Sequence, residues 1–173
     1  RDQVNSVKQA TEFGIKAKTK IIAPVLLYTA RVAGGADSFD GVVGGTSYYW
    51  RLEDTVPTAK AFNDKFRAAH GGAVPSDYGA LWYAGVRSVL TAVKNAGDTD
   101  TDKVIAAMRA LKYDFYKGPQ YYRGCDHQSV QSVLIIESKS KGMKDKNDVF
   151  SIVSIEQPNE KNLRTCDQLG HKA

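Results

Sequence analysis

The chain begins with an amphipathic helix and then a buried strand, and no strand precedes them. Apolar residues recur at helical spacing over residues 4–13, and Gly14 suits the end of a helix. An apolar run then starts near Ile21 and predicts a buried parallel strand over residues 20–25. A helix followed by such a strand is the second half of a strand–helix–strand unit. We therefore expect the chain to be a fragment of a larger α/β protein.

Composition narrows the class of protein without identifying it. The 173 residues are 42% hydrophobic and 25% charged, as in ordinary globular domains, and the length suggests one domain. The formal net charge is +5, but the basic residues are scattered, and acidic residues interrupt their one cluster at residues 139–146. We interpret this cluster as a solvated hairpin tip. Nucleic-acid binding is not expected, because neither a basic face nor a known binding module is present.

Helical spacing continues through the middle of the chain and changes to a period of two beyond residue 111. The longest predicted helix begins after Ser76, runs to about Ala96 and ends at Gly97. Its predicted buried face consists of Leu81, Ala84, Gly85, Val89 and Val93. The other expected segments are a connector with Gly34 and Gly35, a strand at 42–43, helices from 57 and over 102–111, and strands at 120–122, 130–137 and 149–155.

The two cysteines, Cys125 and Cys166, leave two alternatives open. A disulfide between them would close a loop of about 40 residues, stabilise the fold by roughly 4 kcal/mol and imply an oxidising compartment. The alternative is two unpaired thiols in a cytosolic protein. Their spacing excludes a zinc ribbon and a thioredoxin-like motif.

Several local strings, taken in order, resemble a known family. Residues 75–84 have the sequence Pro-Ser-Asp-Tyr-Gly-Ala-Leu-Trp-Tyr-Ala and open an alanine-rich helix that ends at Ala96-Gly97. Later strings are Gly118-Pro119, Tyr122-Arg123, Asp126-His127-Gln128 and Ile135-Ile136-Glu137. Up to about Cys166, the chain resembles the C-terminal half of leucine-binding, type I periplasmic solute-binding proteins of branched-chain amino-acid ABC transporters.

The resemblance implies parts of two three-layer α/β lobes joined by a hinge, with a ligand bound between them. Residues 1–46 would belong to the C-terminal lobe, residues 47–127 to the N-terminal lobe, and residues 128–173 would return as a hairpin and tail. The strands that normally hold a ligand carboxylate would lie in a missing N-terminal part. An extracytoplasmic location, together with the presence of only two cysteines, predicts a disulfide between Cys125 and Cys166.

Ligand-binding candidates follow from the expected fold. Open α/β sheets bind ligands at the carboxyl ends of their strands, which singles out Leu27, Tyr28 and Thr29. Tyr28 could stack on a ligand or donate a hydrogen bond to it; otherwise it is a surface residue that begins a helix.

Two further candidates come from the resemblance and from the expected crossing between lobes. The resemblance places an acidic residue near Asp40 that would meet a ligand ammonium; otherwise Asp40 forms a turn with Gly41. On an extended crossing, Tyr48 and Trp50 would share one face and could line the cleft, or they pack beneath the hinge.

We expect a binding protein rather than an enzyme. It would capture a branched-chain or other amino acid, an amide or an aromatic carboxylate by closure of the two lobes and deliver it to an ABC permease. The same fold could instead serve as the ligand-sensing domain of a regulator or receptor. A Cys–His hydrolase based on Cys125 and His127 is a remote alternative. Neither metal-ligand spacing nor a phosphate-binding loop is present, so no cofactor is expected.

Overall fold

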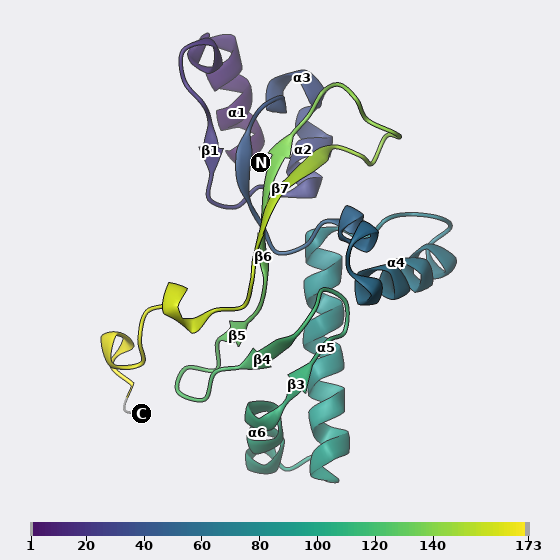
Figure 1. The fold of residues 1–173 in the computed structure, drawn as a ribbon, viewed down its shortest axis with the longest axis vertical. Helices are drawn as coiled ribbons and strands as arrows, with labels where there is room; N and C mark the ends of the chain where they lie inside the picture. The colour runs from purple at the N-terminus through teal and green to yellow at the C-terminus, as the bar shows by residue number, and fades with distance from the viewer. Residues whose placement is uncertain (1, 172–173) are drawn as a thin grey trace.

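The computed structural model describes residues 2–171 as an elongated molecule built around two sheets. The four-stranded sheet has the order β1-β2-β6-β7, and the three-stranded sheet has the order β3-β4-β5. We call the four-stranded sheet with α1, α2 and α3 the first unit, and the three-stranded sheet with α4, α5 and α6 the second unit. The first unit lies at the top of Figure 1 and the second below it.

The first unit is assembled from two separate stretches of the chain. Strand β1 pairs parallel with β2, whereas β2–β6 and β6–β7 are antiparallel. Helix α1 packs on α2 and α3. The elements are α1 (Asp2–Glu12), β1 (Ile22–Ala23), α2 (Tyr28–Gly34), α3 (Ala36–Phe39), β2 (Val43–Thr46), β6 (Val133–Ser138) and β7 (Phe150–Glu156).

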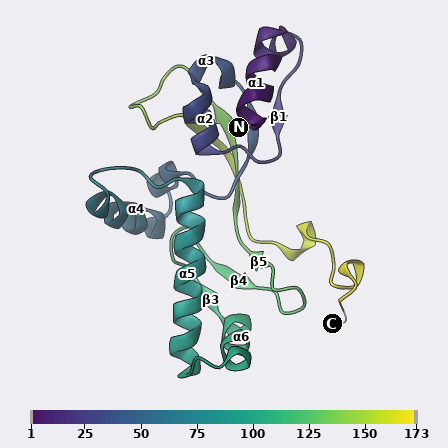
Figure 2. The same ribbon diagram turned by 180° about the vertical axis from the view of Figure 1, so that it is seen from behind.

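The second unit is continuous in sequence. Its strands form an antiparallel sheet, and its longest helix, α5, packs against α6. Figure 2 shows α5 running the length of this unit from behind. The elements are the 3-10 helix η2 (Trp50–Asp54), α4 (Pro57–Ala69), α5 (Asp77–Ala96), α6 (Thr101–Ala110), β3 (Lys112–Tyr113), β4 (Gln120–Tyr122) and β5 (Ser129–Val130).

Two short segments join the units and lie beside each other. The first connection, residues 47–49, leaves β2, and the second connection, residues 131–132, enters β6. Because Thr46 pairs with Leu134, the two connections leave the first unit side by side. A contiguous cluster of buried side chains runs through the first connection at Tyr48 and Tyr49. The lobe boundaries at residues 46 and 127 stay predictions.

After β7 the chain passes from the first unit to the second unit again. The tail beyond Glu156 contains two short 3-10 helices and runs to the loop between β4 and β5. There Cys166 is bonded to Cys125, with 6.1 Å between their Cα atoms. The predicted disulfide is therefore confirmed, and it attaches the tail to the second unit.

The structure corrects several element predictions. The connector around Gly34 and Gly35 is two helices, α2 and α3. The predicted strand over 130–137 is divided into β5 and β6, and β3 was not predicted. The predicted buried face of α5 was right at Ala84 but wrong at Gly85 and Val89, which are exposed. The residues of α5 that are buried are Asp77, Ala80, Ala84, Ser88 and Ala92.

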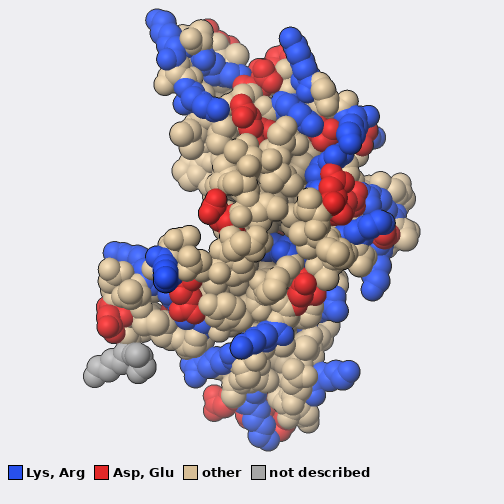
Figure 3. Space-filling model, viewed as in Figure 1, with Lys and Arg blue, Asp and Glu red and all other residues tan. Residues whose placement is uncertain are grey.

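Among residues 2–171, no helix is both long and apolar enough to span a lipid bilayer. The charged residues on the face seen in Figure 3 are of mixed sign, with blue and red side chains interspersed around a largely uncharged middle.

Candidate functional site: a groove between the two units

A groove of about 290 Å³ lies where the first unit meets the start of α5. The carboxyl ends of β1 and β2 form one wall, and the first turns of α5 form the other. The residues that line it, which we call the inter-unit groove, are Pro24, Val25, Leu27, Gly45, Thr46, Ser47, Asp77, Tyr78, Leu81 and Val133. Most of these side chains are apolar, so the groove suits a small ligand with an apolar body.

Local sequence explains how each wall forms. Gly44 lets β1 and β2 approach closely, because a Cβ atom there would lie 2.3 Å from the carbonyl oxygen of Ala23. On the other wall, Ser76 caps α5 by accepting a hydrogen bond from the backbone N–H of Gly79 at 3.1 Å. The cap fixes where α5 begins and so places Asp77 and Tyr78 at the groove.

Asp77 is the one acidic residue of the groove lining. It is 2% exposed, and its Oδ1 atom has no hydrogen-bond partner within residues 2–171. Burial raises the pKa of this carboxyl group, while backbone N–H groups of Asp77, Tyr28 and Tyr78 partly offset the rise. A buried carboxylate without a cationic partner is costly, and a cation placed beside it would lower that cost.

A second hollow, of about 450 Å³, adjoins the groove on the side of α1 and α2. Leu27 and Tyr78 line both hollows. Of the three candidates predicted after the first strand, Leu27 therefore lies at the centre of this region and Thr29 lines the second hollow only. Their roles as ligand-binding residues stay predictions.

Tyr28 lines neither hollow and faces the loop between β6 and β7. Its hydroxyl donates to Asn147 Oδ1 at 2.9 Å. It is also the first residue of α2, as the alternative interpretation expected. Burial raises the pKa of the Tyr28 phenol, and the nearby Asp145 adds to that rise.

Tyr48 and Trp50 are packed inside the protein, 1% and 6% exposed. The Tyr48 hydroxyl donates to Asn63 Oδ1 at 2.6 Å, and the Trp50 indole donates to the carbonyl of Asn147 at 2.9 Å. They do not share a face, because η2 begins at Trp50 and ends the extended alternation. Burial beneath the connections corresponds to the alternative stated for this pair.

Asp40 lies away from the groove, just before β2, whereas the groove lies at the other end of that strand. Its carboxylate is exposed and accepts a hydrogen bond from the backbone N–H of Ser140 at 2.7 Å. The side chain of Ser140, and to a lesser degree this backbone N–H, lowers the pKa of Asp40. Asp40 therefore holds the base of the β6–β7 loop in this structure.

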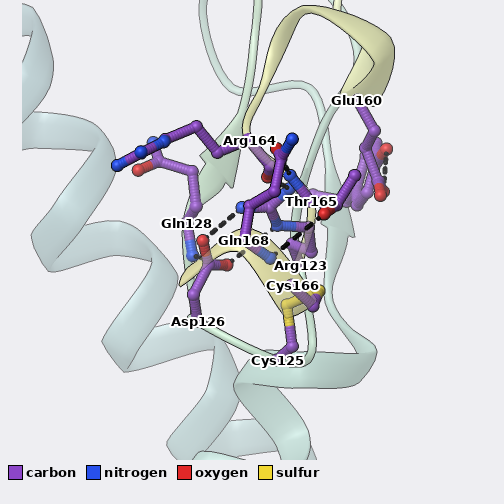
Figure 4. The surroundings of a disulfide bond; sticks show 10 residues. Arg123, Cys125, Asp126, Gln128, Glu160, Arg164, Thr165, Cys166 and Gln168 are labelled. Carbon is purple, nitrogen blue, oxygen red and sulfur yellow. Dashed lines mark hydrogen bonds and ion pairs between the residues drawn. A yellow bond between two sulfur atoms is a disulfide. The ribbon is translucent and has the colours of Figure 1, made fainter. Parts of the chain in front are cut away.

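The Cys–His pair considered from sequence is not available as a nucleophile and base. Cys125 is in the disulfide, and His127 accepts a hydrogen bond from Arg109 at 2.9 Å. Figure 4 shows the disulfide beside the paired side chains of Arg123 and Asp126. Within residues 2–171, no cluster of His, Cys, Asp or Glu could hold a metal ion.

Sequence reasoning missed Asp77 and Tyr78, although the string that contains them contributed to the family resemblance. The sequence did contain a signal, because the cap at Ser76 fixes the start of the helix and so fixes the positions of Asp77 and Tyr78. The sequence contained no evidence that the start of α5 lies opposite the end of β1, which is about 50 residues earlier in the chain.

Comparison with known proteins identifies the class. The profile of the family described as "Periplasmic binding protein" matches residues 1–143, so the chain belongs to the periplasmic binding protein family. This family implies an extracytoplasmic location. The α/β fold of type I periplasmic binding proteins, predicted from the sequence, is confirmed. A search of curated proteins gives no match.

Three solved structures are among the similar ones. A periplasmic binding protein from Burkholderia mallei is 28% identical to this chain, with a TM-score of 0.78. The match covers 91% of this chain and 41% of the Burkholderia protein. An amino acid ABC transporter substrate-binding protein from Pseudomonas fluorescens Pf-5 is 24% identical with a TM-score of 0.88, covering 99% and 44%. An ABC transporter solute binding protein from Rhodopseudomonas palustris BisB5, in complex with 3,4-dihydroxybenzoic acid, is 25% identical with a TM-score of 0.71, covering 89% and 42%. The chain thus spans less than half the length of each.

Proposed function

We propose that this chain is part of an extracytoplasmic solute-binding protein, that it supplies part of a ligand cleft, and that the whole protein delivers the ligand to an ABC permease. The observation that carries the proposal is the inter-unit groove, which is lined by residues of both units at the carboxyl ends of β1 and β2. That position is where open α/β sheets bind ligands. No covalent chemistry is part of the function.

The ligand class follows from the lining. Apolar walls suit the body of a branched-chain or other amino acid, of an amide, or of an aromatic carboxylate. Similar solved proteins carry names that include amino acids and 3,4-dihydroxybenzoic acid. The buried carboxylate of Asp77 favours, among these, a ligand with a positively charged amino group.

The mechanism we propose is closure of the two units on the ligand. A ligand that touches both walls stabilises the closed arrangement in proportion to its extra contacts there. Because the chain spans only 41–44% of the length of the first similar structures, we expect it to bind its ligand weakly when alone.

Nuclear magnetic resonance suits a weak interaction. We would add leucine, a primary amide or 3,4-dihydroxybenzoate at millimolar concentration to the labelled chain. Chemical shifts should move at Val25, Leu27, Ser47 and Tyr78. The variant Leu27→Ala should reduce the response, whereas Asp40→Asn, at the far end of β2, should leave it unchanged. Shift changes confined to residues away from the groove, or an equal loss in both variants, would contradict the proposal.

The nearly isosteric variant Asp77→Asn tests the ligand class separately. It removes a negative charge with little change in volume, so the response to leucine should fall while that to 3,4-dihydroxybenzoate should be kept or rise. An unchanged response to leucine would remove Asp77 from the site but leave the groove assignment intact.

A further inference from the structure

Lys117 is a buried cation placed between the two connections that join the units. The residue is 3% exposed. Its Nζ atom donates to the carbonyl of Ser47 at 2.6 Å and to the carbonyl of Ser132 at 2.9 Å. Ser47 belongs to the first connection and Ser132 to the second, so one amino group holds both.

The surroundings of Lys117 offer polar partners but no counter-charge. The ion pairs found among residues 2–171 do not include it. Its Nζ lies 5.6 Å from the ring centre of Tyr116, and the hydroxyl of Ser132 donates back to the Lys117 carbonyl at 3.4 Å. The acidic residue of its own loop, Asp114, is exposed and accepts hydrogen bonds from Thr58 and Gly118.

Two buried phenols, those of Tyr116 and Tyr48, lie in the same region and are neutral. Tyr116 comes from the same loop, and Tyr48 comes from the first connection and packs on Tyr116 with 5.3 Å between ring centres. Burial raises the pKa of both phenols. These two phenols are therefore uncharged near neutral pH, and the hydrogen bonds of a charged Lys117 go to the carbonyls of Ser47 and Ser132.

This placement links the protonation of Lys117 to the arrangement of the units. Burial lowers its pKa from 10.5 to about 7. If the two connections move apart and water reaches Nζ, the pKa returns toward its ordinary value. A proton therefore binds more tightly to the parted arrangement, and by linkage acid favours that arrangement.

We propose that Lys117 is a positioning residue that makes the relative arrangement of the two units respond to the acidity of the solvent, through its bonds to Ser47 and Ser132. Mildly alkaline solution favours the arrangement described above, and mildly acidic solution favours one in which the connections part. The inference goes beyond ligand binding and can be tested without a ligand, so its failure would leave the proposed function untouched.

The test is a distance measurement between the units in the full 173-residue chain. Spin labels are carried by non-natural amino acids at Gln9 in α1 and Ala106 in α6, both exposed, so that the disulfide is not disturbed. Between pH 5.5 and about 7 the distance distribution of the parent chain should stay constant, because both arrangements hold the proton there. Between about pH 7 and pH 9 it should become single and narrow. An unchanged distribution across this range would overturn the proposal.

Substitutions assign the response to Lys117. Lys117→Met cannot titrate, and Lys117→Gln keeps an N–H donor without titrating; each should abolish the change with pH while all histidines remain. Lys112→Met, at an exposed lysine five positions earlier, is the matched control and should behave as the parent does. If one of the two Lys117 variants does not fold, the pH dependence of the distance distribution in the other variant still tests the proposal. A pH response that survives in a folded Lys117 variant would refute the assignment.

Discussion

At the scale of single residues, Asn63 is the point where buried polar contacts of the second unit converge. It is 0% exposed. Its Nδ2 group donates to the carbonyl of Trp50 and to Glu53 Oε2, both at 2.7 Å, and its Oδ1 atom accepts from the Tyr48 hydroxyl at 2.6 Å. One amide thus connects α4 with η2 and with the first connection.

Replacing Asn63 by alanine should therefore be costly. Asn63→Ala leaves the Tyr48 hydroxyl and the Trp50 carbonyl without a partner in a buried place, so we expect a loss of about 2–4 kcal/mol in the free energy of unfolding. Urea denaturation measures it. Tyr48→Phe removes one bond and its donor together and should cost less, about 1 kcal/mol. Equal effects of the two substitutions would show that Asn63 is not the centre of this network.

Lys117 gives a second residue-scale prediction, for the stability of the whole fold. Its pKa is about 7 when folded and returns to 10.5 on unfolding. Between these values the unfolded chain holds a proton that the folded chain lacks, so the free energy of unfolding rises with pH by up to about 1.4 kcal/mol per unit. Below pH 7 both states are protonated and this contribution is constant.

Denaturation of the parent chain and of Lys117→Met between pH 6 and 10 isolates this contribution, because all other titrating groups are common to both. The difference between the two curves should be flat up to about pH 7 and then rise in favour of the parent. A difference that does not change with pH would mean that Lys117 titrates normally.

Single residues also show how far a sequence can locate a site. Leu27, which lines the groove, was proposed from one general rule, that ligands lie at the carboxyl ends of strands in α/β sheets. Tyr48 and Trp50 were predicted because they fall on the expected crossing between lobes, yet they are buried, because a connection between two units needs a core of its own. The distinction depends on packing partners such as Asn63 and Asn147, which come from distant parts of the chain.

At the scale of elements, capping residues determined the bounds of α5 more reliably than periodicity determined its buried face. Ser76 and Gly97 flank the helix as predicted, Gly97 with a φ of 64°. The predicted face was right at Ala84 but wrong at Gly85 and Val89, because the buried side of α5 is made of small residues such as Ala80 and Ala92. The larger residues Trp82, Val86 and Leu90 are 74%, 54% and 64% exposed.

The connector predicted around Gly34 failed for a different reason. Adjacent glycines usually indicate a flexible loop. Here Gly34 ends α2, and a Cβ atom at that position would lie 2.1 Å from the ring of Phe39 in α3. The residue allows two helices to pack closely, and no local pattern distinguishes that use of glycine from a loop.

The cap of α5 gives the prediction at this scale. Ser76→Ala removes the acceptor for the N–H of Gly79, so we expect a loss of about 1 kcal/mol in stability. The nuclear magnetic resonance signals of Asp77 and Tyr78 should also shift, since the first turn loosens at the groove. Ser6→Ala, at an exposed position within α1, is the control and should change stability little. A similar loss in both variants would show that the cap is not the cause.

At the scale of the whole molecule, the tail is held to the second unit by a small set of contacts around the disulfide. Arg123 donates to the carbonyl of Arg164 at 2.8 Å, and the Tyr121 hydroxyl donates to Glu160 at 2.7 Å. The sequence predicted the bond between the cysteines, but it did not predict that the bond would draw the tail away from the first unit, where β7 ends.

Reduction of this disulfide is the last prediction. The bond links residues 41 positions apart, and opening a loop of that size should lower stability by roughly 2–4 kcal/mol. The tail should also detach, because the hydrogen bonds of Arg123 and Tyr121 to it cannot offset the entropy of ordering its residues. Urea denaturation with and without reductant measures the first effect, and trypsin cleavage after Lys161 and Arg164 measures the second. The variant with both cysteines replaced by serine should match the reduced chain in both assays. Cleavage at an unchanged rate would show that packing alone holds the tail in place.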